Sequence, residues 1–492
     1  MDDGGIIASE EVLLKVWELL SLEGPKLGLE LNPSKCEWSW LDRNYHNPCP
    51  IRVGGDEKCQ IALVPTDEIQ MLGVPLGSDE RAAAYVESKL FGKLPEMVDR
   101  LTEFDDIQSA FFLLRVSFTI VRAVHFMRTT PLVSWRAQAE KFDGTIRSAA
   151  ESILGFPMSD QCYSQACLTP RLGGFGLRRT VDHAEIAFAA SWHEAQDTCR
   201  ERWRPRDDVK SFSTQKRGSF LKDEEILQRL VAEAPNQRER QRLHRIQCEH
   251  AGAWVCAVPS TLDGNDTVMR PRNFQIAALA RLGVPVLKKE ISCSLCLQTM
   301  DIFGDHAACC TKNTDLIHRH NRLRNLLDKI SYEGALSPVM EKKGILGDTP
   351  GRRPGDVTIP LWRRGRGLAI DVAVTCPFSI NNLSRSSPCE HYAESNKHAK
   401  YDSGFVRSNF DFAAMVFEST GGVNAEGLSV LRQLFRFAAK REGLQLSVYC
   451  GRAWARLACN LQSSVAQAVL NRIDSFEISE LSGDITLAEE PF

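Results

Sequence analysis

The sequence lacks the features that mark secreted and membrane-spanning proteins. Its first residues, MDDGGIIASEEVLL, are acidic and contain neither the basic start nor the apolar stretch of a secretory signal. Its longest apolar run, SAFFLLRVSFTIVRAVHFM, is interrupted by Arg115, Arg122 and His125. Ionisable side chains are costly inside a bilayer, so we expect neither export nor a membrane partner.

The chain also has little net charge and no visible repeat. Its formal charge is only −3 over 492 residues, which gives no overall attraction to nucleic acid. Any such binding must therefore come from local basic patches. The one biased segment is the acidic end, ELSGDITLAEEPF. With 43% hydrophobic and 25% charged residues, the composition is that of a globular protein, and the length predicts two to four domains.

Three stretches differ in pattern along the chain. From about 80 to 200, apolar residues recur three and four positions apart, which predicts helices. From about 200 to 250 the chain is rich in arginine, which indicates either a solvated linker with helix faces or a surface that meets nucleic acid. After 290, helices alternate with short apolar runs such as LQLSVYC, which we interpret as strands. This mixture predicts a C-terminal α/β domain that begins near residue 325.

Two strand-like runs in RPGDVTIPLWRRGRGLAIDVAV each carry one aspartate. Alternation of larger and smaller residues puts Asp356 and Asp371 opposite the larger apolar side chains. If the loop is WRRG, residues 362–365, the antiparallel register sets the two aspartates directly opposite each other, with Cβ atoms roughly 5 Å apart. Such carboxylates repel unless a proton or a cation lies between them, and Mg²⁺ or Mn²⁺ suits the gap.

A charged segment downstream, EHYAESNKHAKYDS, has helical spacing. It sets Glu394, Lys397 and Tyr401 on one face, with Lys400 beside them. A lysine near a metal site can stabilise the charge that grows on a phosphate. Upstream, Glu341 in VMEKKG could add a third carboxylate. The alternative interpretation of the segment is a solvated, charged helix.

The stretch CSLCLQTMDIFGDHAACC has the spacing of a zinc site. Cys293 and Cys296 lie two residues apart and His306 follows, so one more thiolate completes a tetrahedral set. The spacing alone leaves Cys309 and Cys310 open as the fourth ligand. The sixteen cysteines of this chain are otherwise expected to be reduced thiols.

Basic residues follow the cysteine cluster and fill the hairpin turn. In HRHNRLR, His318 and His320 are spare zinc ligands or, as we expect, part of a basic face with Arg319, Arg322 and Arg324. Residues expected to contact nucleic acid are Arg319, His320, Arg322, Arg363 and Arg364.

Taken in order, these motifs resemble a known family. CxxC…GDH…C…RHNRLR, ME…GRRPGDV, AIDVAVT and ESNKHAKY resemble the C-terminal part of non-LTR retrotransposon proteins, which carry a zinc knuckle and a restriction-like endonuclease of the PD-(D/E)xK fold. Upstream, EGPKLGLELNPSKCEW, IQMLGVPLGS and RLGGFGLRRTVDHAEIAFAAS resemble the end of a reverse transcriptase palm and its thumb. The opening MDDGG resembles the polymerase turn that carries two aspartates, here Asp2 and Asp3.

The resemblance implies roles for the candidate residues. It makes Asp356 and Asp371 the metal-binding pair, Lys397 or Lys400 the catalytic lysine, Tyr401 its neighbour and Glu341 an accessory carboxylate. In the general nuclease fold the lysine lies two residues after the second acid, where this chain has Ala373. In this retrotransposon branch a helix supplies the lysine, which leaves the two lysines as alternatives. The His-x3-Cys spacing of the family favours Cys310 over Cys309.

The resemblance also implies a multidomain order: palm remnant (1–78), mainly α-helical thumb (79–200), basic linker (201–290), small zinc knuckle (291–325), α/β restriction-like endonuclease (326–475) and acidic tail (476–492). The nucleotide-binding strands that precede the Asp-Asp turn are missing, so Asp2 and Asp3 are expected to be relics without polymerase activity. We expect a nuclear, Mg²⁺- or Mn²⁺-dependent endonuclease with bound Zn²⁺, which nicks a DNA target for target-primed reverse transcription in the intact family. Element RNA is a second expected partner. The alternative is an inactive fragment that only binds nucleic acid.

Overall fold

The computed structural model describes the backbone of residues 4–42, 47–51, 61–200, 214–262, 266–346 and 351–473. Contacts divide the chain into two compact units that interleave in sequence. The first comprises Met1–Pro95, Arg122–Asp143 and Thr180–Gly218, and the second comprises Glu96–Val121, Gly144–Arg179 and Ser219–Phe492. Asp2, Asp3 and the acidic tail lie outside the described residues. All other candidate site residues belong to the second unit.

The first unit begins with short elements and continues as helices. Its elements are α1 (Glu10–Glu23), β1 (Glu37–Trp38), β2 (Ala62–Leu63), β3 (Gln70–Met71), β4 (Val74–Pro75), α2 (Asp79–Phe91), α5 (Val124–Thr129) and α8 (Thr180–Arg200). The parallel pair β1 and β2 lies beside a small core that contains Trp38, Ile51 and Ile61. The Ser78 hydroxyl accepts a hydrogen bond from the Arg81 N–H, which caps the start of α2.

Helices also make up the first part of the second unit. They are α3 (Leu94–Thr102), α4 (Ile107–Leu113), α6 (Arg136–Leu154), α7 (Asp160–Cys167), α9 (Gln215–Ala232), α10 (Gln237–Arg245) and α11 (Pro271–Leu282), of which α3, α6 and α9 begin in the first unit. Of these, α3, α4, α6 and α7, together with α2, α5 and α8, agree with the helical periodicity between 80 and 200.

One stretch, Ile107–Thr129, is long and apolar enough to cross a membrane by length and composition alone. It is broken into α4, a π-helical turn at Leu114–Phe118, a short 3₁₀ turn and α5, and nearly half of it is buried. Leu114 and Phe118 are buried in the second unit. A buried, interrupted stretch of this kind is also typical of the core of a soluble protein, so it is weak evidence for a membrane segment.

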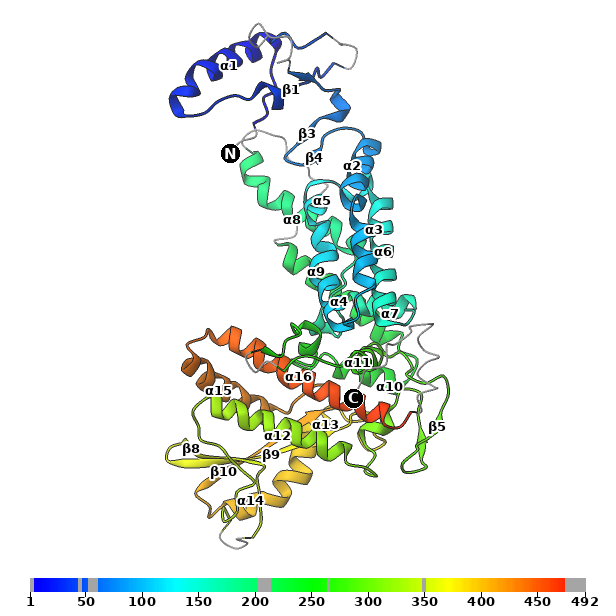
Figure 1. Cartoon of the computed structure of the whole chain (residues 1–492), viewed down its shortest axis with the longest axis vertical. Coiled ribbons are helices and arrows are strands. Elements are labelled where there is room, and N and C mark those ends of the chain that lie inside the picture. The colour runs from blue at the N-terminus through cyan, green and yellow to red at the C-terminus, as the bar shows by residue number, and fades with distance from the viewer. Residues whose placement is uncertain are drawn as a thin grey trace. The chain divides into compact units, whose positions relative to one another are not determined.

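The C-terminal part of the second unit is built on a four-stranded sheet. Its order is β10 (Phe410–Glu418), β9 (Arg366–Thr375), β8 (Val357–Arg363) and β7 (Val339–Met340), with β10 and β9 parallel and the other pairs antiparallel. Figure 1 shows the sheet between α12 (Asp315–Glu333) and α15 (Ala425–Glu442) on one side and α14 (Ala399–Phe405) on the other. Helices on both faces of a mixed sheet form an α/β layer structure.

The two faces of this sheet bury different side chains. Val357, Ile359 and Ile370 point into the main core, together with α12, α15 and α16 (Leu446–Leu470). Ala369 and Ala373 face the other way, toward α13 (Pro388–Tyr392), the π-helical turn Ala393–His398 and α14. The alternation predicted for the two strands is therefore present.

The β8–β9 hairpin corrects one detail of the sequence prediction. Arg363 pairs with Arg366, so the loop is the two-residue turn Arg364-Gly365 and not the four-residue loop 362–365. Both turn residues have positive φ, +50° and +76°, as a type I′ turn requires. A bulge between Ile359 and Arg363 then restores the predicted register, because Val357 pairs with Ile370. The paired residues of β8 begin at Val357, so Asp356 lies just before them, and its N–H bonds to the Ile370 carbonyl and not to Asp371.

One other prediction about an element was wrong. The run LQLSVYC is not a strand, since α16 begins at Leu446. Its apolar residues meet the core through a helical face that includes Tyr449 and Ala453, and packing overrides the strand preference of Val448 and Tyr449. The expected domain boundary at 325 falls inside α12, which runs unbroken from Asp315 to Glu333.

Candidate functional site

The acid pair is held in place by the backbone of the hairpin. The Asp356 N–H donates to the Ile370 carbonyl over 2.8 Å, and the Val372 N–H donates to Asp356 Oδ2 over 2.6 Å. The Asp356 carboxylate is thus bonded to the residue that directly follows Asp371. Asp371 lies in the middle of β9 and is only 7% exposed. Burial raises the pKa of Asp371; the Lys397 ammonium opposes this shift, and the negative charge of Asp356 adds to it.

Lys397 is the lysine that reaches the acid pair. Its Nζ forms an ion pair with Asp371 Oδ2, and both side chains are largely buried. Burial alone would lower the pKa of Lys397, but the Asp371 carboxylate outweighs it, and the net shift is upward. Lys397 therefore stays a cation at neutral pH. In this structure it supplies the positive charge that balances Asp371.

Lys400 and Tyr401 point elsewhere. Lys400 is exposed, and its Nζ lies 4.7 Å from the centre of the Tyr401 ring. Tyr401 packs on Phe412, with ring centres 5.3 Å apart. Glu394 is exposed. The structure thus distinguishes the two candidate lysines, and it favours Lys397.

His320 is a member of the site that sequence reasoning assigned to a basic surface. It lies on α12, and its Nε2 is 3.1 Å from Asp356 Oδ1. The contact spans 36 residues, and no local pattern in HRHNRLR points to it. The helix α12 contacts both β8 and β9 and so delivers the imidazole to the start of β8.

Glu341 lies next to the acid pair along the backbone but not through its side chain. Its N–H donates to the Asp356 carbonyl over 3.0 Å. Its carboxylate instead pairs with Arg324, at 2.6 Å, and with Arg353. Among the residues that the structure describes, no third carboxylate joins Asp356 and Asp371 in a group of mutually close ligands.

The expected nucleic-acid contacts divide into buried and exposed residues. Arg319 is only 4% exposed and donates through Nη1 and Nη2 to the Ala308 carbonyl, at 3.2 and 3.3 Å. It is therefore a core residue that holds the segment of the predicted zinc ligands (residues 293–310, here called the zinc loop), which corrects its placement on a basic face. Arg363 bonds to Gln433, whereas Arg364 and Arg322 are exposed.

The four predicted zinc ligands lie together. One ligand atom from each of Cys293, Cys296, His306 and Cys310 lies within 4.8 Å of all the others. Cys293 and Cys296 belong to the turn between β5 (Ile291–Ser292) and β6 (Thr299–Met300), and His306 and Cys310 lie at the 3₁₀ helix Asp305–Ala308 and just after it. The Cys296 thiol is 3.1 Å from His306 Nε2. A set of three thiols and one imidazole at this spacing matches a tetrahedral structural zinc site.

Hydrogen bonds from the surrounding backbone act on Cys293 and fix the loop of His306. Burial acts to raise the pKa of Cys293, but hydrogen bonds from the N–H groups of Leu295 and Cys296 lower it to about 6. The thiolate, which is the form that binds metal, therefore predominates at neutral pH. The Asp301 carboxylate accepts bonds from the N–H groups of Phe303, Asp305 and His306, which fixes the loop that presents the imidazole.

Cys309 does not point into this group. Its thiol is hydrogen-bonded to the thiol of Cys376, which directly follows β9 and is buried. The choice that the spacing left open is therefore resolved geometrically in favour of Cys310. Cys309 instead links the zinc loop to the end of the central strand.

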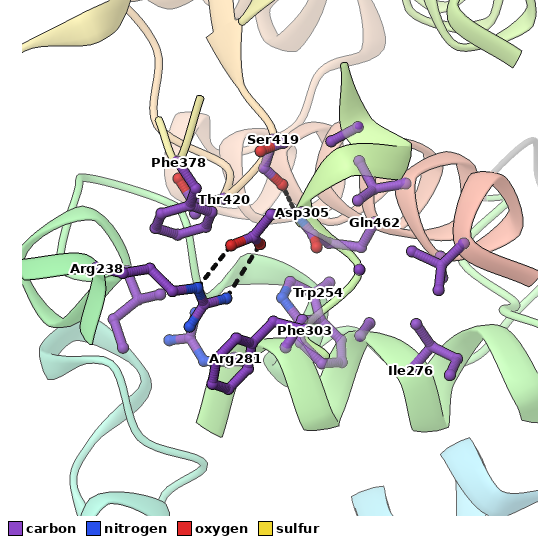
Figure 2. A pocket seen from close by; sticks show the side chains of 18 residues that line it. Arg238, Trp254, Ile276, Arg281, Phe303, Asp305, Phe378, Ser419, Thr420 and Gln462 are labelled. Atoms are coloured by element: carbon purple, nitrogen blue, oxygen red, sulfur yellow. Dashed lines mark hydrogen bonds and ion pairs between the residues drawn. The ribbon is translucent and has the colours of Figure 1, made fainter. Parts of the chain in front are cut away.

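Arg238 makes a second link between the zinc loop and the sheet. Its guanidinium donates to both Asp305 oxygens, at 2.6 and 3.0 Å. It also lies 3.6 Å from the ring centre of Phe303 and 4.8 Å from that of Phe378, which follows β9. Figure 2 shows Arg238 and Asp305 joined beside these rings at one side of a small pocket. Arg238 therefore fixes the zinc loop and the end of β9 to α10.

No protein-family model matches this chain, and the search of curated proteins found no match to it. The functional proposal consequently rests on the geometry of the two sites and on the motifs themselves.

Proposed function

We propose that the chain is a metal-dependent DNA endonuclease of the kind found in non-LTR retrotransposon proteins. One observation carries the proposal: Lys397, from the π-helical turn, pairs with Asp371 on β9, and the Asp356 carboxylate just before β8 lies close enough to act on both charges. Perturbed titratable groups that converge in this way are typical of catalytic sites. The order of the motifs supports the same assignment.

The donor atoms of the acid pair suit Mg²⁺ or Mn²⁺. Carboxylate oxygens are the ligands that these hard cations prefer, and Asp356 and Asp371 would hold the ion. When bound, such an ion activates water and neutralises charge on the phosphate. Glu341 does not fit as a direct ligand, because two arginines occupy its carboxylate.

The protein groups around the pair have separate tasks. The Lys397 ammonium can stabilise negative charge that develops on the phosphate oxygens. His320 and the Val372 N–H hold the two oxygens of Asp356, which keeps that carboxylate facing Asp371. The zinc ligands would have a structural task, because four protein ligands leave no open position for a substrate.

A nicking assay on supercoiled plasmid tests the proposal. Full-length protein with zinc bound should convert supercoiled to open circular DNA in Mg²⁺ or Mn²⁺. Asp371→Asn should abolish this conversion because it removes a charged ligand without changing side-chain volume. Asp411→Asn is the matched control, since Asp411 lies on the neighbouring strand β10 and pairs with Arg366 at 2.7 Å, away from the acid pair.

The outcome separates the two candidate functions. Loss of nicking in Asp371→Asn but not in Asp411→Asn supports the endonuclease. Wild-type protein that binds DNA but nicks it no faster than Asp371→Asn would favour a binding-only protein. The DNA target and the element RNA remain part of the proposal, as does a nuclear location.

A further inference from the structure

A second polar pocket lies in the same unit, away from the acid pair. It is enclosed by α12, α16 and the segment that leads into α11, and its volume is about 480 Å³. Figure 1 shows α12 and α16 running side by side, and the two helices are in contact. No residue of the zinc site or of the acid pair lines this pocket.

Helical spacing explains why the two walls are polar. Arg322 and Lys329 are seven positions apart on α12, so they lie on the same side of that helix, two turns apart. Arg456, Asn460 and Ser463 have the same relation on α16, at intervals of four and three residues. Each helix thus turns one polar stripe toward the other across the pocket.

The lining has a strong excess of positive charge. Arg270, Arg322, Lys329 and Arg456 are cationic, and Asp266 is the single acidic residue of the lining. Arg270 precedes the first turn of α11, whose N-terminal end carries a partial positive charge. Arg270, Arg322 and Lys329 are exposed and form the accessible edge. The whole chain has a net charge of −3, so this concentration of cations is local.

The deeper part of the lining contains polar atoms without partners. The Arg456 side chain is only 5% exposed, and its Nη1 bonds to Glu333 at 3.0 Å. Its Nε and Nη2 are buried and have no hydrogen-bond partner among the described residues. A buried guanidinium with two unpaired donors is costly, because each has lost its bonds to water. Both atoms are closed off from the pocket as it stands, so an anion with several oxygens would satisfy them only if the Arg456 side chain turned toward it.

We propose that this pocket binds a phosphate group, carried either by a nucleic-acid strand or by a free nucleotide. Arginine donors arranged as a fork match the oxygens of phosphate, and the three exposed cations can guide the group toward Arg456. His320 and Arg322 are two positions apart on α12, about 200° around the helix. The pocket therefore opens on another side of α12 from Asp356 and binds phosphate independently of the acid pair.

Binding measurements on the full-length protein test this site. The probes are a fluorescein-labelled single-stranded 15-mer, followed by anisotropy, and AMP and inorganic phosphate as unlabelled competitors, without added divalent ion. The double variant Arg322→Gln/Lys329→Gln should weaken strand binding about tenfold at 0.1 M salt and reduce the slope of log K against log salt by about 1.4. The matched control is Arg436→Gln/Lys440→Gln, which removes two exposed cations from α15.

A third variant tests the buried arginine. Arg456→Lys keeps the positive charge and can keep the Glu333 pair, but it removes the forked donors. It should weaken strand and AMP binding several-fold, with little change in thermal unfolding. Its failure to do so would leave the exposed cations as a nonspecific surface and overturn the site.

The competitors identify the source of the phosphate. If AMP displaces the strand from wild-type protein but not from the Arg322/Lys329 variant, the pocket accepts a single phosphate group. If only a strand binds and the pocket variants weaken it, the ligand is a nucleic-acid backbone. The proposal fails if the α15 control loses as much affinity as the pocket variants, or if none of the variants changes binding. None of these readouts requires nicking, so the nuclease proposal can fail separately.

Discussion

Asp371 and Lys397 depend on each other at the scale of single residues. The side chains are 10% and 17% exposed, so both charges are largely removed from water. A buried charge whose partner is removed is strongly destabilising, and a perturbed carboxyl of this kind is costly to ionise without its cation. If a metal ion were bound, Asp371 would hold it in place of the ammonium, and Lys397 would then be free to stabilise negative charge on a phosphate.

This relation predicts that the two neighbouring lysines differ in effect. Lys397→Ala should reduce the nicking rate by about 100-fold or more, because it removes the cation beside the developing charge. Lys400→Ala should leave the rate nearly unchanged and serves as the matched control. Initial rates on supercoiled plasmid measure both, and thermal unfolding checks that each variant folds. A larger loss in Lys400→Ala would reverse the assignment.

The raised pKa of Asp371 predicts a shifted acid limb in the pH profile. Ion binding needs the ionised carboxylate, so nicking should rise with pH through an apparent pKa above the ordinary value for aspartate, about 3.9. High Mg²⁺ should move this limb to lower pH, since the ion competes with the proton. A profile that is already flat from pH 4 upward would show that Asp371 is not the group that binds the ion.

Cys309 and Cys310 should differ in their effect on bound zinc, as Lys397 and Lys400 should differ in their effect on nicking. If the cluster binds zinc, wild-type protein should carry about one ion per chain and Cys310→Ser should lose it, because the substitution removes one of the four candidate ligands. Cys309→Ser should retain it, because that thiol bonds to Cys376. Metal analysis of the purified variants distinguishes them. Zinc retained in Cys310→Ser and lost in Cys309→Ser would exchange their roles.

At the scale of elements, the sequence predicted the acid pair better than its surroundings. Strand alternation and hairpin register are local, so the pairing of Val357 with Ile370, and with it the nearness of Asp356 to Asp371, could be inferred. The π-helical turn Ala393–His398 could not, because no residue pattern marks the extra residue in a π turn. It breaks the α-helical face on which Glu394, Lys397 and Tyr401 were expected to meet.

Contacts between distant elements were also invisible in the sequence. Arg319 and His320 are adjacent in a basic motif, yet one bonds to the Ala308 carbonyl and the other to Asp356. Whether an arginine is buried depends on what packs over α12, which single-sequence patterns do not encode. The cluster of Cys293, Cys296, His306 and Cys310 was predictable for the opposite reason, since its members lie within eighteen residues of the sequence.

His398 fixes the π-helical turn to the rest of the sheet layer. Its Nδ1 is 2.9 Å from Asp402, and its Nε2 is 3.0 Å from Glu426, which also accepts the Ala414 N–H. Burial would lower the pKa of His398, but the two carboxylates outweigh it and raise the pKa. The stabilisation is therefore complete below the unfolded value of about 6.5 and is lost as pH rises through the higher folded value.

Unfolding in urea at a series of pH values tests this linkage. As the pH rises above about 6.5, the free energy of unfolding of wild-type protein should fall relative to that of His398→Gln, because the glutamine cannot gain a proton. Lys397 sits on the same turn, so nicking by wild-type protein should also decline there more than nicking by the variant. Parallel pH profiles for the two proteins would show that His398 contributes no such stabilisation.

At the scale of the whole molecule, the zinc loop belongs to the second unit and is not a freestanding module. Arg319 bonds to it from α12, Arg238 joins it to α10, and Cys309 meets Cys376 at the end of β9. The second unit is accordingly compact across the zinc loop, the helices around it and the sheet. If the zinc loop binds an ion, removal of that ion should destabilise the sheet as well as the loop.

Calorimetry of the full-length protein tests this coupling. Structural zinc contributes about 10 to 16 kcal/mol of apparent binding energy in finger peptides, and part of that energy should stabilise the second unit here. Chelation should lower the temperature of one unfolding transition and leave another, from the first unit, in place. A chelated protein whose transitions are all unchanged would show that the loop folds without stabilising its neighbours.

The bulge in the β8–β9 hairpin has a consequence for inherited changes in length. Between the pairs Ile359–Leu368 and Arg363–Arg366, three residues on β8 stand against Gly367 alone on β9, a surplus of two. Side chains alternate with a period of two, so an even surplus leaves every side chain on its own face. Loss of one codon between 360 and 362 would leave an odd surplus, whereas loss of two codons would remove the bulge and keep Val357 opposite Ile370. Length variation in this hairpin should therefore be tolerated in steps of two residues.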